Sequence, residues 1–182
     1  VGILGTGKIG AAVIKNLSGF GCRILASDIR ENPSLKGLCT YVDNETLYKA
    51  CDIISLHMPL LDSTRHFVNA ETIARMKDGV TIINCARGEL MNIPDMIRGI
   101  ETQKIGALAL DVFDKEDGIY HENRRDDIIS NRDMAYLRQF PNVIMTQHMA
   151  FYTDAAVQSM VFCGIEGLCD FARTGHTATE LV

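Results

Sequence analysis

The sequence contains no tryptophan, only four prolines and no long run of basic residues. Its net charge of −5 argues against nucleic acid as the main partner, because phosphate backbones are bound chiefly by clustered Lys and Arg. No apolar stretch reaches the roughly 18 residues that a membrane-spanning helix needs, and the first residues do not form a signal peptide. These absences predict a cytoplasmic protein without nucleic acid or membrane partners.

The six cysteines and five histidines are scattered along the chain. No CxxC pair occurs, and no two histidines are spaced as HxxH or HxxxH, so the sequence predicts no metal site. Most of the cysteines lie inside apolar runs. We therefore expect reduced, mostly buried thiols of the kind that cytosolic proteins carry.

What the chain does contain is an alternation of apolar β-type runs and helical patterns. Its 182 residues, 47% of them hydrophobic, are enough for one sizeable core. Short continuous apolar strands that alternate with helices predict an α/β fold, a doubly wound parallel sheet covered on both faces. We expect strands at 1–5, 22–27, 52–57, 80–85, 105–112 and 142–147, and helices near 8–18, 45–50, 70–77, 93–102 and 132–139.

The most specific motif is a glycine fingerprint, Gly5-Thr6-Gly7-Lys8-Ile9-Gly10, between the first strand and the first helix. In such a loop the first glycine makes the tight turn, the second lets backbone N–H groups approach a pyrophosphate, and the third lets helix and strand pack closely. Asp28 follows Gly10 by 18 residues at the end of the second strand. Its carboxylate can accept hydrogen bonds from a ribose and repels a 2′-phosphate, which predicts NAD rather than NADP. The alternative is a tight turn that holds no ligand.

Polar residues follow several of the predicted strands: His57, Arg87, the segment Asp111 to Glu116, and His148. In an open parallel sheet, ligands bind beyond the carboxyl ends of the strands. We therefore expect these residues to gather at the edge of the sheet that holds the cofactor.

Three of these residues have side chains suited to one reaction. Arg87 offers a planar fork of donors that fits a carboxylate. His148 suits the proton exchange that accompanies hydride transfer between an alcohol and a ketone. A Glu116 carboxylate bonded to His148 would stabilise the imidazolium and fix its tautomer. Each also has a structural alternative: an arginine paired with an acid, a structural histidine, and a solvent-facing acid in the charged loop 114–133.

The last helix is expected from about Thr153 to Arg173. Its apolar face is typical of a helix that covers a sheet rather than one that holds a cofactor, and consists of Val157, Met160, Val161, Gly164, Ile165, Leu168 and Phe171 or Ala172. Because Val1 already lies within the first strand, we expect the chain to be a piece of a longer protein.

Taken together, these motifs resemble the D-isomer-specific 2-hydroxyacid dehydrogenases. The resemblance is carried by VGILGTGKIG, DIISLHMPL, RMKDGVTIINCARGEL, ALDVFDKE and FPNVIMTQHMAFYT, which span residues 1–152. The 29 residues from Arg87 to Glu116 and the 32 from Glu116 to His148 match the family's long-loop branch, as does the stretch Tyr120 to Asp127. That branch is similar to D-lactate and D-2-hydroxyisocaproate dehydrogenases.

The resemblance implies a fold and a set of site residues. Residues 1–152 would form a Rossmann-like NAD-binding domain, and 153–182 a C-terminal helix and tail that pack on, or lead back to, a substrate domain outside this sequence. Arg87 would bind the substrate carboxylate, His148 would donate the proton, and Glu116 would orient His148. Phe151 or Tyr152 would face the substrate side chain. The implied cofactor contacts are Gly5, Thr6, Gly7, Lys8, Ile9, Gly10, Asp28, Ile29, Met58, Pro59, Thr64, Cys85, Ala86, Arg87, Asp111 and His148.

The function that follows is reversible, NAD-dependent interconversion of a D-2-hydroxy acid and its 2-keto acid by a homodimeric complete protein. Lactate, 2-hydroxyisocaproate, phenyllactate and 2-hydroxyglutarate stay open as substrates, because the family's substrate domain is mostly encoded before the fingerprint. Gln147 replaces the family's usual proline without removing a chemical group. The alternative is an NAD(H)-sensing binding module, like a corepressor of the same family. The fragment alone is expected to bind NAD weakly and to turn over little.

Overall fold

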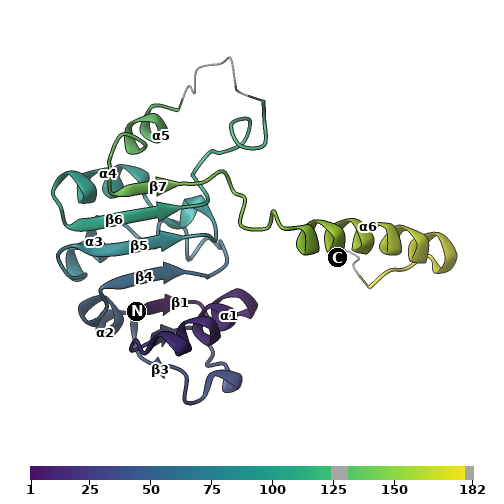
Figure 1. Cartoon of the computed structure of the whole chain (residues 1–182), viewed down its shortest axis with the longest axis horizontal. Coiled ribbons are helices and arrows are strands. Elements are labelled where there is room, and N and C mark those ends of the chain that lie inside the picture. The colour runs from purple at the N-terminus through teal and green to yellow at the C-terminus, as the bar shows by residue number, and fades with distance from the viewer. Residues whose placement is uncertain (124–130, 179–182) are drawn as a thin grey trace. The chain divides into compact units, whose positions relative to one another are not determined.

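The computed structural model describes residues 1–123 and 131–178. Contacts divide the chain into two compact units, Val1–His148 and Met149–Val182. The first unit is built on a seven-stranded parallel sheet in the order β3-β2-β1-β4-β5-β6-β7 (Figure 1). This is the doubly wound α/β architecture predicted from the sequence. The domain boundary after residue 152 stays a prediction.

The strands are short. Those that match the predicted apolar runs are β1 Gly2–Leu4, β2 Leu25–Ser27, β4 Ile53–Leu56, β5 Val80–Asn84, β6 Ile105–Leu110 and β7 Val143–Met145. The prediction of a six-stranded sheet is wrong by one edge strand, β3 Thr40–Tyr41, which pairs with β2. Two residues give no apolar run, so this strand has no signal of its own in the sequence.

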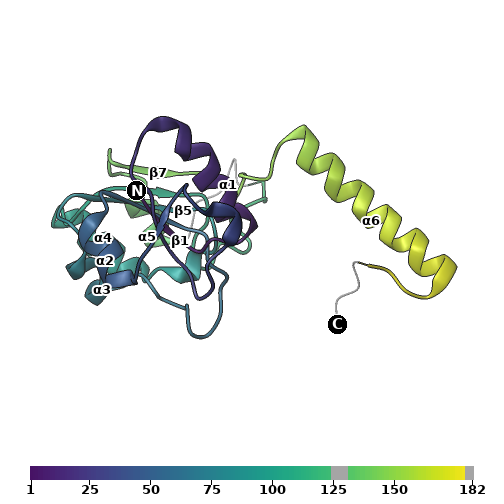
Figure 2. The same ribbon diagram turned by 90° about the horizontal axis from the view of Figure 1, so that it is seen from below.

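Helices cover both faces of the sheet. The helices are α1 Lys8–Leu17, α2 Asn44–Ala50, α3 Ala70–Arg75, α4 Ile93–Glu101, α5 Arg132–Leu137 and, in the second unit, α6 Asp154–Thr174. Figure 2 shows α1 on one face and α2, α3 and α4 on the other. Side-chain caps fix several helix starts, for example Asn92, whose Oδ1 accepts a hydrogen bond from Asp95 N.

Each face of the sheet has its own buried cluster. Ile3 belongs to the cluster that includes Ala11 and Ile14 of α1, whereas its neighbour Leu4 belongs to the larger cluster on the opposite face. Successive side chains of a strand point to opposite faces. The central strand β1 is therefore buried on both sides, and its carboxyl end is held firmly.

The strand order reverses at β1. β2 and β3 extend the sheet on one side of it, and β4 to β7 extend it on the other. Loops that leave the carboxyl ends of β1 and β4 diverge, which creates the crevice where open parallel sheets bind ligands. A backbone hydrogen bond of 2.7 Å from His57 N to Leu4 O holds the bases of these two loops together.

The second unit contains the long helix α6. The predicted apolar face is present, and Met160, Val161, Ile165, Leu168 and Phe171 are each more than half exposed. No residue of α6 is buried. Within its own unit this face is exposed, and the expectation that the helix covers a sheet stays a prediction.

By length and composition, α6 is also the one described helix that could cross a membrane, with a mean hydropathy of 1.2 over an 18-residue window. The expectation that no segment reaches this length is wrong by that measure, because it counted only uninterrupted apolar runs. A single such helix is weak evidence for a membrane span. Glu166 lies within the apolar sequence of the helix, and a charged residue at the centre of a membrane helix costs about 3 kcal/mol.

The cysteines are all free, as expected for reduced thiols, but only Cys51 is buried. Cys22, Cys85, Cys163 and Cys169 are exposed. The expectation of mostly buried thiols is therefore wrong. Two of the exposed thiols lie on helix α6, and Cys85 lines a cavity.

The close approach of α1 to the glycine loop gives a stability test. A Cβ at Gly10 would lie 2.0 Å from Gly5 O, and this backbone atom cannot move aside. We expect Gly10→Ala to lower the free energy of unfolding by about 2–3 kcal/mol. Gly19→Ala is the matched control, because a Cβ there meets nothing within 4 Å. Urea unfolding of both variants measures the difference, and equal stability of the two would contradict the packing argument.

Candidate active site

The glycine loop turns sharply at Gly5 and opens at Gly7. Gly5 has a φ of +94°, which favours glycine, and a Cβ on it would lie 2.7 Å from the carbonyl carbon of His57. A Cβ on Gly7 would instead meet nothing within 4 Å. The fold therefore does not require a glycine at position 7. The open space lies at the N-terminus of α1, where backbone N–H groups attract anions such as a pyrophosphate.

A cavity of about 470 Å³ lies between the loops that follow β1, β4 and β5. Its walls are formed by Gly7, Lys8, Ile9, His57, Met58, Pro59, Leu60, Cys85, Ala86 and Arg87. Except for His57 and Leu60, all of these residues were predicted to contact a cofactor. The structure thus brings predicted contacts from three separate loops into one cavity of the size that small-molecule sites have.

Asp28 lies at the carboxyl end of β2, beside the glycine loop. Its Oδ2 accepts hydrogen bonds from Thr6 N at 2.5 Å and from Thr6 Oγ1 at 3.0 Å. Partial burial raises the pKa of Asp28, but the hydrogen bonds from Thr6 and Arg30 outweigh it and hold the pKa below its usual range. Asp28 is therefore ionised at neutral pH. An exposed carboxylate with the fully exposed Ile29 next to it fits the ribose and adenine of a dinucleotide.

Thr64 shapes the loop after β4 instead of lining the cavity. Its hydroxyl donates to Pro59 O at 2.8 Å and accepts from Leu61 N at 2.8 Å. These bonds curl the loop over residues 59–64. The predicted contact of Thr64 with the cofactor stays a prediction, whereas Met58 and Pro59 do line the cavity.

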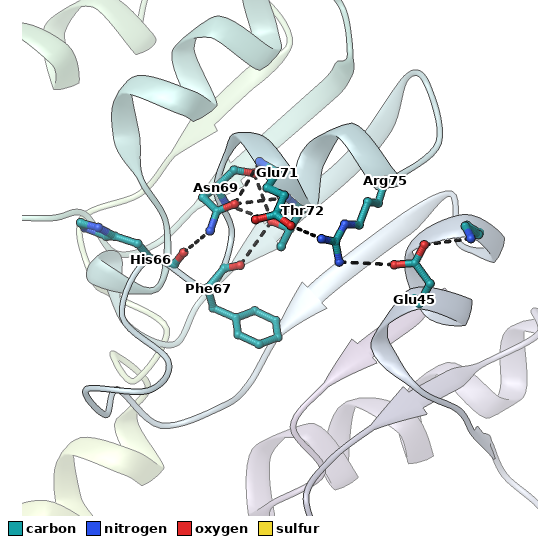
Figure 3. A network of polar contacts seen from close by, with 8 residues as sticks. Glu45, His66, Phe67, Asn69, Glu71, Thr72 and Arg75 are labelled. Carbon is teal, nitrogen blue, oxygen red and sulfur yellow. Dashed lines mark hydrogen bonds and ion pairs between the residues drawn. The ribbon is translucent and has the colours of Figure 1, made fainter.

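The far end of the same loop is anchored at the start of α3 (Figure 3). Asn69 accepts hydrogen bonds from the backbone of Glu71 and Thr72 and donates to His66 O at 2.9 Å. Arg75 forms ion pairs with Glu71 and with Glu45 of α2, which ties the two helices together. The loop that carries Met58 and Pro59 is therefore fixed at both ends.

Arg87 is presented by a loop that Asn84 organises. The fully buried Asn84 side chain accepts from Ala86 N at 3.0 Å and donates to Arg87 O at 2.8 Å. Arg87 itself is exposed, and its guanidinium donates to Ala86 O at 2.7 Å. Within residues 1–123 and 131–178 it forms no ion pair. The alternative of an arginine paired with a structural acid thus finds no support there.

The loop that carries Arg87 approaches the loop after β6 closely at two points. Asp111 N donates to Asn84 O at 3.0 Å, and a Cβ on Gly88 would lie 2.1 Å from the carbonyl carbon of Phe113. Partial burial of the Cys85 thiol raises its pKa, and the nearby Asp111 carboxylate raises it further. The cavity wall and the Asp111 segment are therefore immediate neighbours.

Glu116 and His148 meet at the same edge of the sheet. His148 Nδ1 lies 2.5 Å from Glu116 Oε1, and Glu116 Oε2 accepts a hydrogen bond from Phe113 N at 2.7 Å. The side chains are 32% and 22% exposed for His148 and Glu116. With the carboxylate as acceptor, the proton of the ring lies on Nδ1, and Nε2 is left to exchange a proton with a ligand.

The backbone at His148 is left-handed, with φ at +53°. His148 N donates to Asp111 O at 2.6 Å, and Thr146 Oγ1 donates to Asp111 Oδ1 at 2.5 Å. A histidine in this conformation costs of the order of 1 kcal/mol, and such strain persists where the surroundings impose it and clusters at functional sites. The ring of His121 lies beside that of His148, with centroids 6.0 Å apart.

The structure therefore brings together part of the predicted catalytic set. Glu116 and His148 are in contact, and Arg87 lies in the cavity wall, but no hydrogen bond joins Arg87 to that pair among the described residues. Phe151 and Tyr152 belong to the second unit, where their rings pack edge to face. The role of Phe151 and the roles of the other site residues stay predictions. Of the expected insertion, residues 124–127 lie outside the described part.

Sequence reasoning missed Asn84, Thr146 and Tyr41 as residues that shape the site. A polar residue inside an otherwise apolar strand is the signal that could have found Asn84. Thr146 has the weaker signal of lying two residues before His148. Tyr41 has none, because it lies in the strand that the sequence does not reveal.

The matches between this chain and known proteins extend over all the residues of the candidate site. A family model described as "D-isomer specific 2-hydroxyacid dehydrogenase, NAD binding domain" matches residues 1–150. An aromatic 2-oxoacid reductase of Clostridium sporogenes is 43% identical over 183 residues, which cover 100% of this chain and 55% of that protein.

Solved structures agree with this match. A D-lactate dehydrogenase from Treponema pallidum aligns with a TM-score of 0.95 at 35% identity, over 100% of this chain and 55% of its own. A D-lactate dehydrogenase with NAD+ from Lactobacillus jensenii aligns with a TM-score of 0.90 at 34% identity, over 100% of this chain and 54% of its own. The chain thus spans about half the length of the relatives it matches.

The half-buried His57 predicts a pH-dependent stability. Its Nε2 lies 2.9 Å from Ser55 Oγ, and burial lowers its pKa below the ordinary value of 6.5. On acidification the unfolded ring takes up a proton before the folded ring does, so the unfolded state gains stability. We expect the free energy of unfolding to fall between about pH 7 and pH 5, and to fall less in His57→Gln.

Urea denaturation across this pH range measures the effect. His176→Gln, which replaces an exposed imidazole, is the control and should leave the pH dependence unchanged. If His57→Gln kept the full pH dependence of the unaltered protein, burial of His57 would not be its cause.

Proposed function

The chain belongs to the family of D-isomer specific 2-hydroxyacid dehydrogenases, matching its NAD-binding domain, and we propose that the whole protein interconverts a D-2-hydroxy acid and its 2-keto acid with NAD. The observation that carries the proposal is the Glu116–His148 pair, 2.5 Å apart. It lies beside Asp111, which borders the cavity wall at Cys85. A proton-exchanging group next to a dinucleotide cavity is what the oxidation of an alcohol requires.

Arg87 supplies the binding group for the substrate. Its guanidinium is exposed and has no acidic partner in the described part of the chain. A 2-keto acid offers a carboxylate, and arginine binds carboxylates with two parallel hydrogen bonds. Arg87 therefore orients the substrate by its acid group and holds the keto carbon toward the cofactor side of the cavity.

His148 moves the proton. In reduction, its ring donates a proton from Nε2 to the keto oxygen, and in oxidation the same atom accepts the hydroxyl proton. Glu116 stabilises the protonated ring and keeps its orientation, because Phe113 N fixes the second carboxylate oxygen. Only one tautomer of the neutral ring keeps the bond to Glu116, so Nε2 is always the atom presented to the substrate.

The residues of the first unit fit NAD. Asp28 would accept from the ribose, the glycine loop and the N-terminus of α1 would hold the pyrophosphate, and the loop of Cys85 and Ala86 would border the nicotinamide side. When bound, NAD supplies the hydride acceptor for oxidation, and its reduced form supplies the hydride donor for reduction.

The substrate side chain is left open by the described residues. One relative is named an aromatic 2-oxoacid reductase and others are named D-lactate dehydrogenases. Lactate, 2-hydroxyisocaproate, phenyllactate and 2-hydroxyglutarate are therefore all candidates for this protein. A homodimer and a cytoplasmic location are part of the proposal.

An activity assay on the whole protein tests the function. We expect NADH oxidation with at least one of pyruvate, 2-ketoisocaproate, phenylpyruvate and 2-ketoglutarate. The corresponding 2-keto amide is the matched control and should react poorly, because it lacks the carboxylate that Arg87 binds. The absence of turnover with every keto acid would overturn the proposal. A change of oligomeric state with NADH but without turnover would favour an NAD-sensing module instead.

Variants of the histidine–acid pair test the mechanism. We expect His148→Asn to lower kcat by about 10²–10⁴-fold, the usual contribution of general acid–base catalysis. Asparagine tolerates a left-handed backbone, so the variant should fold. Glu116→Gln should lower kcat by about 10–100-fold.

His66→Asn is the matched control for these variants. His66 also has a left-handed backbone, with φ at +52°, but it lies outside the cavity and the Glu116–His148 pair. The kcat of the His66→Asn variant should equal that of the unaltered protein. Steady-state kinetics measure kcat for the three variants. Full activity of His148→Asn would refute the assigned proton donor.

A further inference from the structure

A line of hydrogen bonds connects the edge strand β3 with the acid of the cofactor site. The Tyr41 hydroxyl donates to Thr6 Oγ1 at 2.9 Å, and Thr6 Oγ1 donates to Asp28 Oδ2 at 3.0 Å. At the other end, Asn32 N donates to the Tyr41 hydroxyl oxygen at 2.9 Å. Three segments that lie apart in the sequence are joined in this way: the glycine loop, the loop 28–32 and β3.

All hydrogens in this line point toward Asp28. An ionised carboxylate can only accept, so the Thr6 hydroxyl must donate to it. Thr6 Oγ1 is then free to accept only from Tyr41, whose own oxygen accepts from a backbone N–H. Because the donors at one end and the acceptor at the other are fixed, the line has a single orientation. Bonds aligned in this way polarise and strengthen one another.

The line also fixes the glycine loop. Thr6 is only 2% exposed, and Asn32 Nδ2 donates to its carbonyl oxygen at 3.1 Å. Thr6 is thus held from two sides, through its hydroxyl by Tyr41 and through its backbone by Asn32. The position of Asp28 relative to the loop depends on these contacts.

The same contacts decide which atom of the carboxylate a ligand meets. Oδ2 takes two hydrogen bonds from Thr6, whereas Oδ1 takes one, from Arg30 N at 3.2 Å. A carboxylate oxygen has two lone-pair positions, so Oδ1 keeps more acceptor capacity than Oδ2, although Ile29 N also acts on the carboxylate. A ribose hydroxyl supplies a hydrogen that Oδ1 can accept. A 2′-phosphate brings negative charge instead.

We propose that Tyr41 is a positioning residue for cofactor selectivity: through Thr6 it holds Asp28 in the orientation that accepts a ribose hydroxyl, and in this way it sets the preference for NAD over NADP. The inference rests on the proposed NAD-dependent function. It gives the short strand β3 a role in the site, since β3 carries Tyr41 to the glycine loop.

Tyr41→Phe removes the hydroxyl and keeps the ring. On the whole protein, calorimetric titration gives the dissociation constants of NAD and NADP. We expect Kd for NAD to rise by about 3–10-fold, which corresponds to the loss of roughly one hydrogen bond. Kd for NADP should rise by less than about 2-fold, because NADP does not use the remaining acceptor capacity of Asp28 Oδ1. The ratio of Kd for NADP to Kd for NAD therefore falls.

A double-mutant cycle tests the route through Thr6. Thr6→Val removes the hydroxyl on which Tyr41 acts, and it should lower the NADP to NAD ratio at least as much as Tyr41→Phe. In the Thr6→Val background, Tyr41→Phe should change Kd for NAD by less than about 1.5-fold. Thr6→Val also serves as the second test if Tyr41→Phe does not fold.

Tyr48→Phe is the matched control. Tyr48 is a buried tyrosine of α2, and its hydroxyl forms no hydrogen bond within the described residues. In Tyr48→Phe, the ratio of Kd for NADP to Kd for NAD should equal that of the unaltered protein. Weaker binding of NAD and NADP by the same factor in Tyr41→Phe, with the ratio unchanged, would mean a structural role only and would overturn the inference.

The two proposals can fail separately. If the unaltered protein binds NAD but reduces no 2-keto acid, the proposed activity fails and the ratio test of Tyr41 still applies. If keto acids are reduced and the ratio is the same in Tyr41→Phe, the selectivity inference alone is refuted.

Discussion

The site depends on the parallel pairing of β1 with β4, closed at its end by the hydrogen bond from His57 N to Leu4 O. β1 is packed on both faces, so the carboxyl ends of the two strands are as rigid as the core. At their bases the two loops touch so closely that a Cβ on Gly5 would strike the backbone of His57 and Met58. Beyond that contact they diverge, and the cavity is the space that opens between them.

The Glu116–His148 pair is held in place by hydrogen bonds to backbone groups rather than by side-chain packing. Phe113 N holds one oxygen of Glu116, and Asp111 O holds His148 N, although His148 must adopt a left-handed conformation to be reached. Groups held in this way need little rearrangement when charge develops during a reaction, which is how preorganised sites stabilise transition states. The strain at His148 is offset by the bonds that surround it.

The sequence predicted what is local and missed what depends on distant partners. The apolar runs and the glycine fingerprint predicted the sheet, because burial on both faces and a tight turn impose specific residue types. β3 was missed because its pairing with β2, not its composition, makes it a strand. Tyr41 lies 35 residues from Thr6, so no spacing rule could reveal their bond. The exposure of Cys22 and Cys85 depends on which distant segments cover them, and no local pattern reports this. Side-chain chemistry suggested roles for Arg87, Glu116 and His148, and the family resemblance favoured those roles over the structural alternatives.

The empty space around Gly7 separates folding from recognition at a single residue. A methyl group there contacts nothing, and the backbone φ of −64° suits any residue. Replacing glycine by alanine at such a position can even raise the melting temperature, because it restricts the unfolded chain. An engineering campaign that selects for expression, solubility or heat resistance would therefore accept this substitution. It would produce a sturdier protein with an obstructed ligand site, and none of its screens would register the loss.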